Sequence, residues 1–224
     1  MTHFKIDTPI SVKIKQQLWL IKSQAFHKIK RILDIGLSLL AIVILSPLLI
    51  LTALLIRLES SGNVLFKQQR IGLNGIPFTI LKFRSMFDNA DQNRTKLESQ
   101  NEMSNGVIFK IKQDPRITRV GRVIRKTSID ELPQLFNVLI GNMSLVGPRP
   151  PLANEVAQYS SHDRIRLDVL PGITCLWQVS GRSDVPFNEQ VQLDIEYIEK
   201  QSIGLDLILL LRTIPAVIKG NGAY

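Results

Sequence analysis

Two adjacent acids, Asp130 and Glu131, are the strongest candidates for chemistry in this sequence. Ser128 precedes Glu131 by the spacing of a capping box, so we expect a helix to begin at Ser128. Both acids would then lie in the first helical turn, where free backbone N–H groups and the helix dipole favour anions and can hold phosphate oxygens. Acids in a first turn are also common without a catalytic role, and Glu131 could be a capping partner alone.

Basic residues from several segments could surround these acids. Four arginines recur at every third position upstream of the acid pair, and further cations lie nearby or in separate segments: Arg116, Arg119, Arg122, Arg125, Lys126, Lys82, Arg84 and Arg149. An acid pair among converging cations suits chemistry on a diphosphate, because the cations offset its charge while the acids bind a metal ion or attack phosphorus. Any single arginine could equally belong to a solvated basic surface.

An apolar segment, residues 35–56, contains no charged residue and could form a helix that crosses a hydrocarbon core of about 30 Å. Basic residues flank it on both sides, however, which a single crossing does not explain. Because Pro47 removes the hydrogen bond to the Val43 carbonyl, we expect a bend there, with Ser46 or a neighbouring helix supplying a new partner. A re-entrant helix that returns to the same face fits both observations; a kinked but complete crossing is the alternative.

Most of the formal net charge of +9 comes from residues 1–31, which hold seven basic residues and one acid. This arm could be attracted to anionic lipid headgroups, at about 1 kcal/mol per cation near the surface, or could be a solvated tail. The single cysteine, Cys175, excludes an internal disulfide, and three scattered histidines form no metal-ligand pattern. A reducing compartment is therefore expected, and the N-terminal segment does not have the pattern of a signal peptide.

The remaining chain has the pattern of a mostly helical catalytic domain. Extended runs at 64–67 and 78–83 flank a turn at 72–75 and predict a small β-hairpin. Helices are expected at 116–126, 129–140, 152–168 and 187–200, and the apolar segment 205–218 could lie at a membrane interface or pack on the core. The predicted fold class is α+β, with a basic arm at 1–27, a broken re-entrant membrane helix at 28–60, and a catalytic domain at 61–224 that amphipathic helices help to seat on the membrane.

Seven motifs follow one another along the chain: KRILD at 30–34, LSP at 45–47, FKQQRIG at 66–72, KFRSM at 82–86, DELPQLFNV at 130–138, MSLVGPRP at 143–150 and LWQVSGR at 176–182. Together they resemble the bacterial sugar transferase family of monotopic polyprenyl-phosphate phosphoglycosyl transferases. The resemblance extends from about residue 28 to the end of the chain. Two positions depart from the family pattern, because Cys175 replaces a usual glycine and Asn142 replaces a common acid.

The resemblance implies a reaction in two steps. Asp130 would attack the β-phosphate of a uridine diphosphate (UDP) sugar and release uridine monophosphate (UMP), and polyprenyl phosphate would then accept the phosphosugar. Mg²⁺ held by Asp130 and Glu131 would neutralise the diphosphate, and Ser46 and Pro47 would break the membrane helix. Contacts with phosphate or nucleotide are implied for a larger set: Lys82, Arg84, Arg125, Arg149, Pro150 and Arg182. Arg182 could instead be a structural residue that closes a loop.

These observations predict an enzyme that initiates exopolysaccharide, capsule or O-antigen (lipopolysaccharide) assembly at the cytoplasmic face of the bacterial inner membrane. The motif at 176–182 favours a hexose such as galactose or glucose. The expected partners are a UDP-sugar, undecaprenyl or another polyprenyl phosphate, and inner-membrane lipid, and the protein could form a homo-oligomer. A membrane-tethered nucleic-acid-binding protein is one alternative, but neither a recognition helix nor an aromatic platform is apparent, so no nucleic acid is expected. A scaffold without catalysis is another, and the intact acid pair disfavours it.

Overall fold

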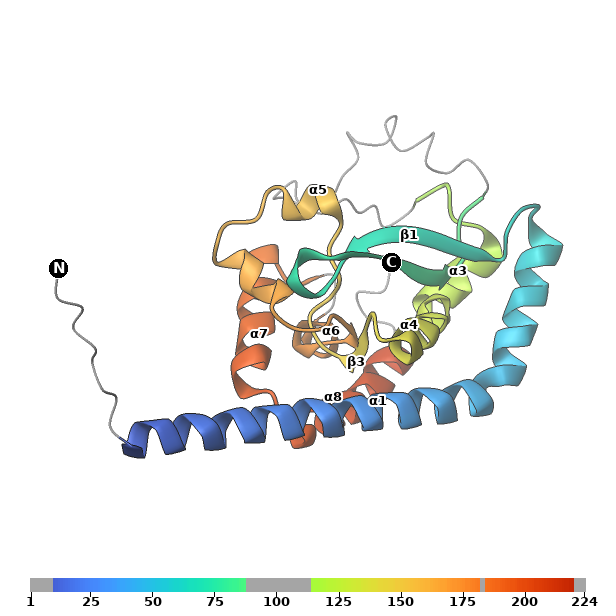
Figure 1. Ribbon diagram of the computed structural model, residues 1–224. Coiled ribbons are helices and arrows are strands. Elements are labelled where there is room, and N and C mark those ends of the chain that lie inside the picture. Colours follow the sequence, from blue (N-terminus) through green and yellow to red (C-terminus); the bar gives the residue numbers. More distant parts are fainter. Residues whose placement is uncertain (1–9, 88–113, 182–183, 220–224) are drawn as a thin grey trace.

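The longest element is α1 (Ile10–Glu59), a bent helix of 50 residues. The computed structural model describes residues 10–87, 114–181 and 184–219. Figure 1 shows α1 turning sharply partway along its length, with the other labelled helices and strands on the inner side of the bend. The helix contains one internal proline, Pro47, and the Ser46 hydroxyl donates a 2.8 Å hydrogen bond to the Val43 carbonyl. Pro47 leaves that carbonyl without its usual N–H donor, so the expected replacement bond is confirmed.

Much of the apolar surface of α1 is exposed. The part from Gln24 to Glu59 is long and apolar enough to cross a membrane, judged by length and composition. Its exposed side chains include Ile32, Val43 and Leu58. A continuous apolar surface of this extent is unusual on a protein that is surrounded by water alone. Because α1 begins at Ile10, the second half of the segment predicted as a basic arm continues into the apolar helix without a break.

The predicted β-hairpin is confirmed. Strands β1 (Leu65–Ile71) and β2 (Pro77–Phe83) pair antiparallel, with Leu65 opposite Phe83 and Ile71 opposite Pro77. They are joined by the 3-10 turn η1 (Leu73–Gly75), in which Asn74 has a left-handed backbone. Asparagine tolerates that conformation better than most residues, which is why the turn can form at this point.

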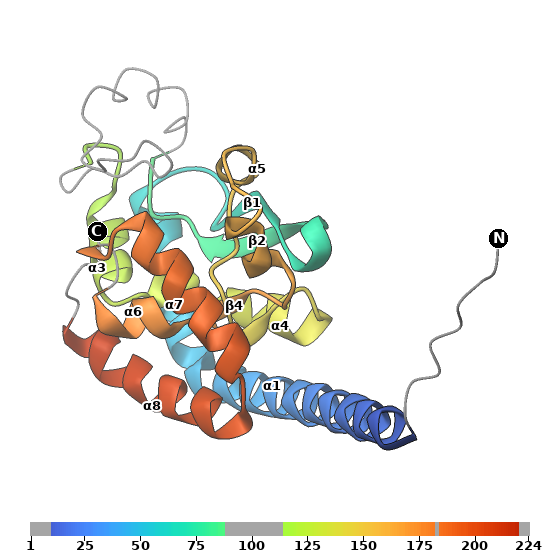
Figure 2. The same cartoon turned by 90° about the vertical axis from the view of Figure 1, so that its left-hand side faces the viewer.

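Helices make up most of the remaining structure. Their bounds are α3 (Arg119–Lys126), η4 (Ile129–Glu131), α4 (Gln134–Ile140), α5 (Ala153–Val156), η5 (Asp163–Leu167), α6 (Leu176–Ser180), α7 (Phe187–Lys200) and α8 (Ile203–Lys219). Two three-residue strands, β3 (Ser144–Val146) and β4 (Gly172–Thr174), pair in parallel. In Figure 2, α6 lies between α7 and α8, and α8 runs beneath both. The predicted α+β class is therefore confirmed.

Two helix predictions are wrong in their continuity. The helix expected at 152–168 is divided into α5 and η5. In the segment between them, the Asp163 carboxylate accepts hydrogen bonds from the hydroxyl and the backbone N–H of Ser160, and the Ser160 hydroxyl accepts one from the Asp163 backbone N–H. Such local side-chain bonds compete with helical ones. The helix expected at 129–140 is divided into η4 and α4 at Pro133, which has no N–H to continue the first turn.

Two hydrophobic clusters attach the domain to the two limbs of α1. The larger contains Val138, Met143 and Tyr197 and includes Leu37 and Ala41 from the part of α1 before the proline. The second contains Phe83 and Ile124, and includes Leu49, Ala53 and Ile56 from the part after the proline; Ile129 packs against it. Because Ile129 precedes Asp130, the second limb of α1 supports the backbone of the acid pair.

Candidate active site

Asp130 and Glu131 lie in the 3-10 turn η4, directly before α4. The predicted capping box is wrong, because Ser128 has a left-handed backbone with φ 53° and its side chain makes no capping bond. This conformation costs a non-glycine residue about 1–2 kcal/mol, and it redirects the chain between α3 and η4. The Glu131 carboxylate is consequently free of a capping role and accepts a hydrogen bond from Lys82.

Lys82, at the end of β2, reaches Glu131 across the site. Lys82 Nζ lies 2.5 Å from Glu131 Oε1, and the two side chains are 21% and 28% exposed. The buried Asn137 fixes this register, because its amide accepts from the Leu81 N–H at 2.9 Å and donates to the Thr79 carbonyl at 2.7 Å. These two bonds hold α4 against β2 and so place the carboxylate opposite the ammonium. Asn137 is not among the predicted site residues, although its place in the motif at 130–138 could have indicated it.

The two acids differ in pKa. Burial, with the Glu131 charge as the second cause, raises the pKa of Asp130 to about 6, although the charges of Lys82 and Arg125 act in the opposite direction. Burial would raise the pKa of Glu131 too, but the charge and hydrogen bond of Lys82 and the charge of Arg149 hold it below its usual value. Adjacent acids with divergent pKa values are typical of acids with different roles. Among the salt bridges of the described residues, Glu131 has one and Asp130 has none.

Two arginines, Arg70 and Arg149, bring further positive charge to Glu131. Arg70 is buried in β1, where it donates to the Pro150 carbonyl at 3.1 Å and to Gln68 Oε1 at 2.7 and 3.1 Å. Burial and then the Arg149 charge lower the pKa of Arg70 to about 10, so it remains a cation at neutral pH. Arg70 is missing from the predicted site, although its place in the motif at 66–72 could have indicated it.

Arg125 reaches the site from the last turn of α3. Its Nε donates a 2.8 Å hydrogen bond to Ser85 Oγ, and Asp130 and Arg125 perturb each other's pKa. Backbone packing holds α3 in this place, because a Cβ added at Gly121 would lie 1.9 Å from the Ser85 carbonyl oxygen. Thr118 also donates its N–H to that oxygen and caps α3 with its side chain. The close approach at Gly121 therefore positions Arg125 beside the acid pair.

Other predicted residues have different surroundings. Arg84 donates to the Ser60 and Ser61 carbonyls at 2.8 and 2.6 Å, so it closes the end of α1. Pro150 is buried and contributes its carbonyl to Arg70. Arg182 lies outside the described residues.

The arginine series at 116–125 is divided between several roles. Arg116 forms a salt bridge with the buried Asp114. Burial by itself would raise the pKa of Asp114, but hydrogen bonds from Arg116 outweigh it and lower that pKa. Arg119 and Arg122 are exposed on α3. Of these four arginines, Arg125 is the one whose charge is among the main influences on the pKa of Asp130, which it lowers.

The two departures from the family pattern cause no backbone strain. Cys175 has an extended backbone, with φ −152° and ψ 173°, which any residue can adopt. Its thiol is fully buried and donates to Gln178 Oε1 at 3.2 Å. Asn142 donates its N–H to the Asn137 carbonyl at 3.0 Å.

A divalent cation at this site would have Asp130 and Glu131 as its protein ligands. In residues 10–87, 114–181 and 184–219, no three His, Cys, Asp or Glu side chains gather in a way that could hold a metal ion. Mg²⁺ is commonly bound through one or two carboxylates, with water and substrate phosphates completing its shell. Two half-buried carboxylates fit that mode of binding.

Comparison with known proteins gives a consistent result. Residues 25–220 match the family model described as "Bacterial sugar transferase". The chain is 46% identical over 195 residues to the galactosyl transferase CpsE of Streptococcus agalactiae, covering 87% of this chain and 43% of that protein. It is 40% identical to the exopolysaccharide production protein ExoY of Sinorhizobium fredii, covering 87% and 88% of the two chains. It is 41% identical to the UDP-glucose:undecaprenyl-phosphate glucose-1-phosphate transferase of Caulobacter vibrioides, covering 87% and 72%. The chain therefore belongs to the bacterial sugar transferase family.

Proposed function

We propose that this enzyme transfers a hexose 1-phosphate, such as that of galactose or glucose, from a UDP-sugar to undecaprenyl or another polyprenyl phosphate. The observation that carries this proposal is the acid pair, Asp130 and Glu131, among the cations Lys82, Arg125 and Arg149, on a domain attached to an exposed apolar helix. The names of relatives support the substrates, because they include a UDP-glucose:undecaprenyl-phosphate glucose-1-phosphate transferase and an exopolysaccharide production protein. The product would begin a cell-surface polysaccharide.

Asp130 is assigned as the nucleophile. A carboxylate oxygen of Asp130 forms a bond to the β-phosphorus, the bond from that phosphorus to the oxygen bridging the two phosphates breaks, and UMP leaves with the electron pair. An oxygen of polyprenyl phosphate then attacks the same phosphorus and displaces the carboxylate, which regenerates Asp130 and yields a polyprenyl diphosphate sugar. Asp130 suits this role because no salt bridge in the described structure occupies its carboxylate, whereas Glu131 is bonded to Lys82.

The surrounding cations would stabilise the negative charge that shifts to the leaving UMP. Lys82, Arg125 and Arg149 are assigned to phosphate contacts, and the same assignment for Arg84, Pro150 and Arg182 rests on the family resemblance alone. Preorganised charges in a half-buried site stabilise a developing anion without reorganisation. Mg²⁺ bound by Asp130 and Glu131 would neutralise part of the diphosphate charge.

The proposed location is the cytoplasmic face of the bacterial inner membrane, with α1 as a re-entrant helix. Two observations support it: the exposed apolar surface of α1 and the bend that accompanies Pro47. A nucleotide sugar is a cytoplasmic compound, so the acid pair must face that compartment. The basic residues near both ends of the apolar segment also favour that side.

The test is release of UMP from detergent-extracted protein given Mg²⁺ and a panel of UDP-hexoses and UDP-acetamidohexoses. We expect a UDP-hexose to yield UMP in an amount equal to the enzyme before lipid is added, and continuous turnover after polyprenyl phosphate is added. Intact-mass measurement should detect a phosphosugar adduct in the first condition. Strict dependence of UMP release on the lipid would indicate direct attack by the lipid phosphate and would contradict the covalent step.

The pH dependence should identify the nucleophile. The pKa of Asp130 is raised to about 6 in the metal-free site, and a bound cation would lower it. The acidic limb of kcat/KM for the UDP-sugar should therefore lie at or below pH 6, with a fall of about tenfold per pH unit as the carboxylate becomes protonated. Burial also raises the pKa of Asp194 to about 6, so the profile by itself does not assign the group. Glu131→Gln does: it removes a charge that raises the pKa of Asp130, and the acidic limb of the residual activity should move to lower pH. An unmoved limb would exclude Asp130 as its origin.

A further inference from the structure

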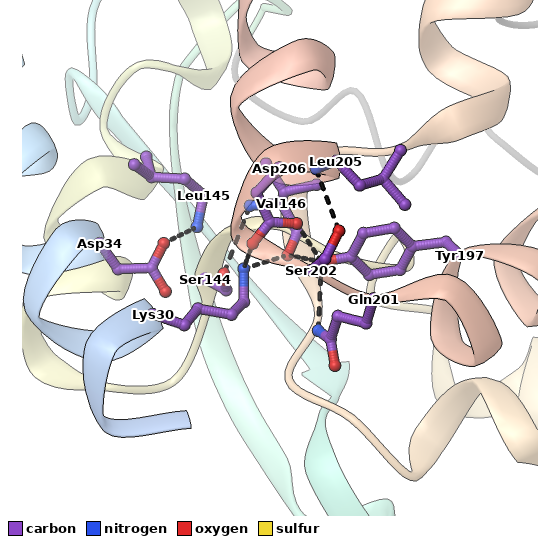
Figure 3. A network of polar contacts seen from close by, with 10 residues as sticks. All are labelled: Lys30, Asp34, Ser144, Leu145, Val146, Tyr197, Gln201, Ser202, Leu205 and Asp206. Carbon is purple, nitrogen blue, oxygen red and sulfur yellow. Dashed lines mark hydrogen bonds and ion pairs between the residues drawn. The ribbon is translucent and has the colours of Figure 1, made fainter. Parts of the chain in front are cut away.

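A buried polar cluster joins α1, β3, α7 and α8 outside the proposed active site (Figure 3). Lys30 Nζ lies 2.5 Å from Asp206 Oδ2 and donates to the Val146 carbonyl at 3.2 Å. The Tyr197 hydroxyl lies 2.7 Å from Asp206 Oδ1 and 3.0 Å from the same Val146 carbonyl. Lys30, Asp206 and Tyr197 are all buried. Two side chains from different helices therefore converge on one backbone oxygen of β3.

That oxygen lies three residues before Arg149, in a segment that is also held from its other side. Gly147 donates its N–H to the Thr174 carbonyl at 3.0 Å, and Gly172 donates to the Pro148 carbonyl at 2.9 Å. The approach is so close that a Cβ added at Gly147 would lie 2.4 Å from the Leu170 carbonyl oxygen. Between β4 on one side and the buried cluster on the other, the backbone that leads to Arg149 has little freedom.

The same stretch of α1 also holds α4, the helix that follows the acid pair. One turn after Lys30, the Asp34 carboxylate accepts a 3.1 Å hydrogen bond from the Leu145 N–H. Arg31 donates to the Val138 and Leu139 carbonyls, in the last turn of α4, at 2.5 and 2.9 Å. Lys30, Arg31 and Asp34 thus fix both β3 and α4 to a single helix. Strand β3 leads to Arg149, and α4 follows Glu131.

The chemistry of Lys30 indicates more than packing. Burying an ammonium requires a carboxylate and further hydrogen bonds, whereas an apolar side chain of similar size would fill the space without that penalty. The ammonium adds directional hydrogen bonds, because it holds both the Asp206 carboxylate and the Val146 carbonyl in place. Tyr197 reaches the same two groups from α7 and does so without a charge.

We propose that Lys30 and Tyr197 are positioning residues for Arg149. They fix the Val146 carbonyl, and through it the Arg149 backbone, at the place where the guanidinium acts on Glu131 and on the substrate phosphates. This inference rests on the proposed function for its catalytic consequence, whereas the structural link can be measured without it. The link also makes the geometry of the active site depend on how the membrane helix α1 is held.

The experiment compares Lys30→Met and Tyr197→Phe with Lys28→Met in the full chain, extracted in detergent. Lys28 is an exposed cation on the same helix, so its replacement makes the same change of charge without touching the cluster. Hydrogen exchange of a peptide covering residues 144–150 measures how firmly the backbone that leads to Arg149 is held. The value of kcat/KM for the UDP-sugar measures the consequence for catalysis. Each variant is also combined with Arg149→Lys, because effects that act through one residue are not additive.

We expect Lys30→Met and Tyr197→Phe to increase exchange in residues 144–150 and Lys28→Met to leave it unchanged. Lys30→Met should lower kcat/KM roughly tenfold in the native background and by clearly less beside Arg149→Lys, as coupled residues do. Equal losses in both backgrounds, unchanged exchange in Tyr197→Phe, or the same losses in Lys28→Met would overturn the proposal. If the native protein releases no UMP but the exchange differences appear, the structural link stands and the proposed function fails.

Discussion

Asp130→Asn is expected to reduce UMP release by about 10⁴-fold or more, the size of loss that follows removal of a covalent nucleophile. The amide cannot form the acyl phosphate, so neither half of the reaction can proceed through this residue. No phosphosugar adduct should be detectable by intact mass. Glu131→Gln should also lower turnover severely, but it leaves the Asp130 carboxylate in place, so some adduct should still form.

The same substitution should leave the protein folded. The pKa of Asp130 is higher in the folded protein, at about 6, than its ordinary value of 3.8. The folded state therefore binds the proton more tightly, and the stability that this contributes is present below pH 3.8 and is lost as pH rises through about 6. At pH 7 the buried, ionised carboxylate lowers the free energy of unfolding, and a neutral amide does not have this effect. The midpoint of thermal unfolding at pH 7 should thus be unchanged or higher in Asp130→Asn.

Asp168→Asn provides the matched control, because Asp168 is an exposed aspartate at the end of η5 and outside the acid pair. It should retain native UMP release and native stability. An Asp130→Asn protein that still accumulates a phosphosugar adduct would place the nucleophile on another residue. A variant that loses activity together with its thermal transition would leave the assignment to the adduct mapped by peptide mass in the native enzyme.

The fold was predictable where one local pattern decides the structure. The hairpin follows from two extended runs around a turn that contains Asn74, and α7 follows from residues 187–200. Predictions failed where bonds between side chains and the backbone divide a helix, as at Ser160 and Asp163. Strands β3 and β4 have three residues each, which is too short for an alternating pattern, and they exist because they pair with each other.

The charged residues of the candidate site could be named from the sequence, whereas their positioning could not, and their catalytic and binding roles stay predictions. The structure brings Lys82 and Arg125 to the acid pair as expected from their segments. The role of Asn137 depends on contact between α4 and β2, which sequence spacing does not contain. Ser128 illustrates the opposite error: its spacing from Glu131 is that of a capping box, but Lys82 competes for the carboxylate and a charged partner forms the stronger bond.

The second large effect concerns the bend in α1. Both limbs of this helix are bonded to the same domain, because Lys30 and Arg31 bond to β3 and α4 before the proline. At its other end, Glu59 accepts the backbone N–H groups of Arg119 and Val120, at 2.7 and 2.9 Å. A single small domain lies on one side of a bilayer. We therefore expect a helix whose two ends are both tied to that domain to return to the side from which it enters.

Replacing Ser46 with Ala and Pro47 with Leu together should weaken this return. The leucine would restore a backbone N–H for the Val43 carbonyl, and loss of the Ser46 hydroxyl removes the bond that now satisfies it. In lipid every backbone polar group needs a partner, so the variant gains a continuous helix in place of a bent one. A straight helix cannot keep the contacts of both Lys30 and Glu59 with the domain. Because these contacts favour the bent form, we expect only part of the population to adopt a crossing form.

Single cysteines at position 15, on the basic arm, and at position 63, just after α1, would report the topology in intact cells. A Cys175→Ser background removes the native thiol, which is buried in any case. Neither site should react with a membrane-impermeant thiol reagent in the native helix, and both should react after lysis. The Ser46 and Pro47 double variant should expose one site from outside in a fraction of molecules, whereas Pro215→Leu, which removes the proline of α8, should expose none. If one of the two sites reacts from outside while Ser46 and Pro47 are intact, α1 crosses the membrane and the bonds at its two ends do not hold it on one side.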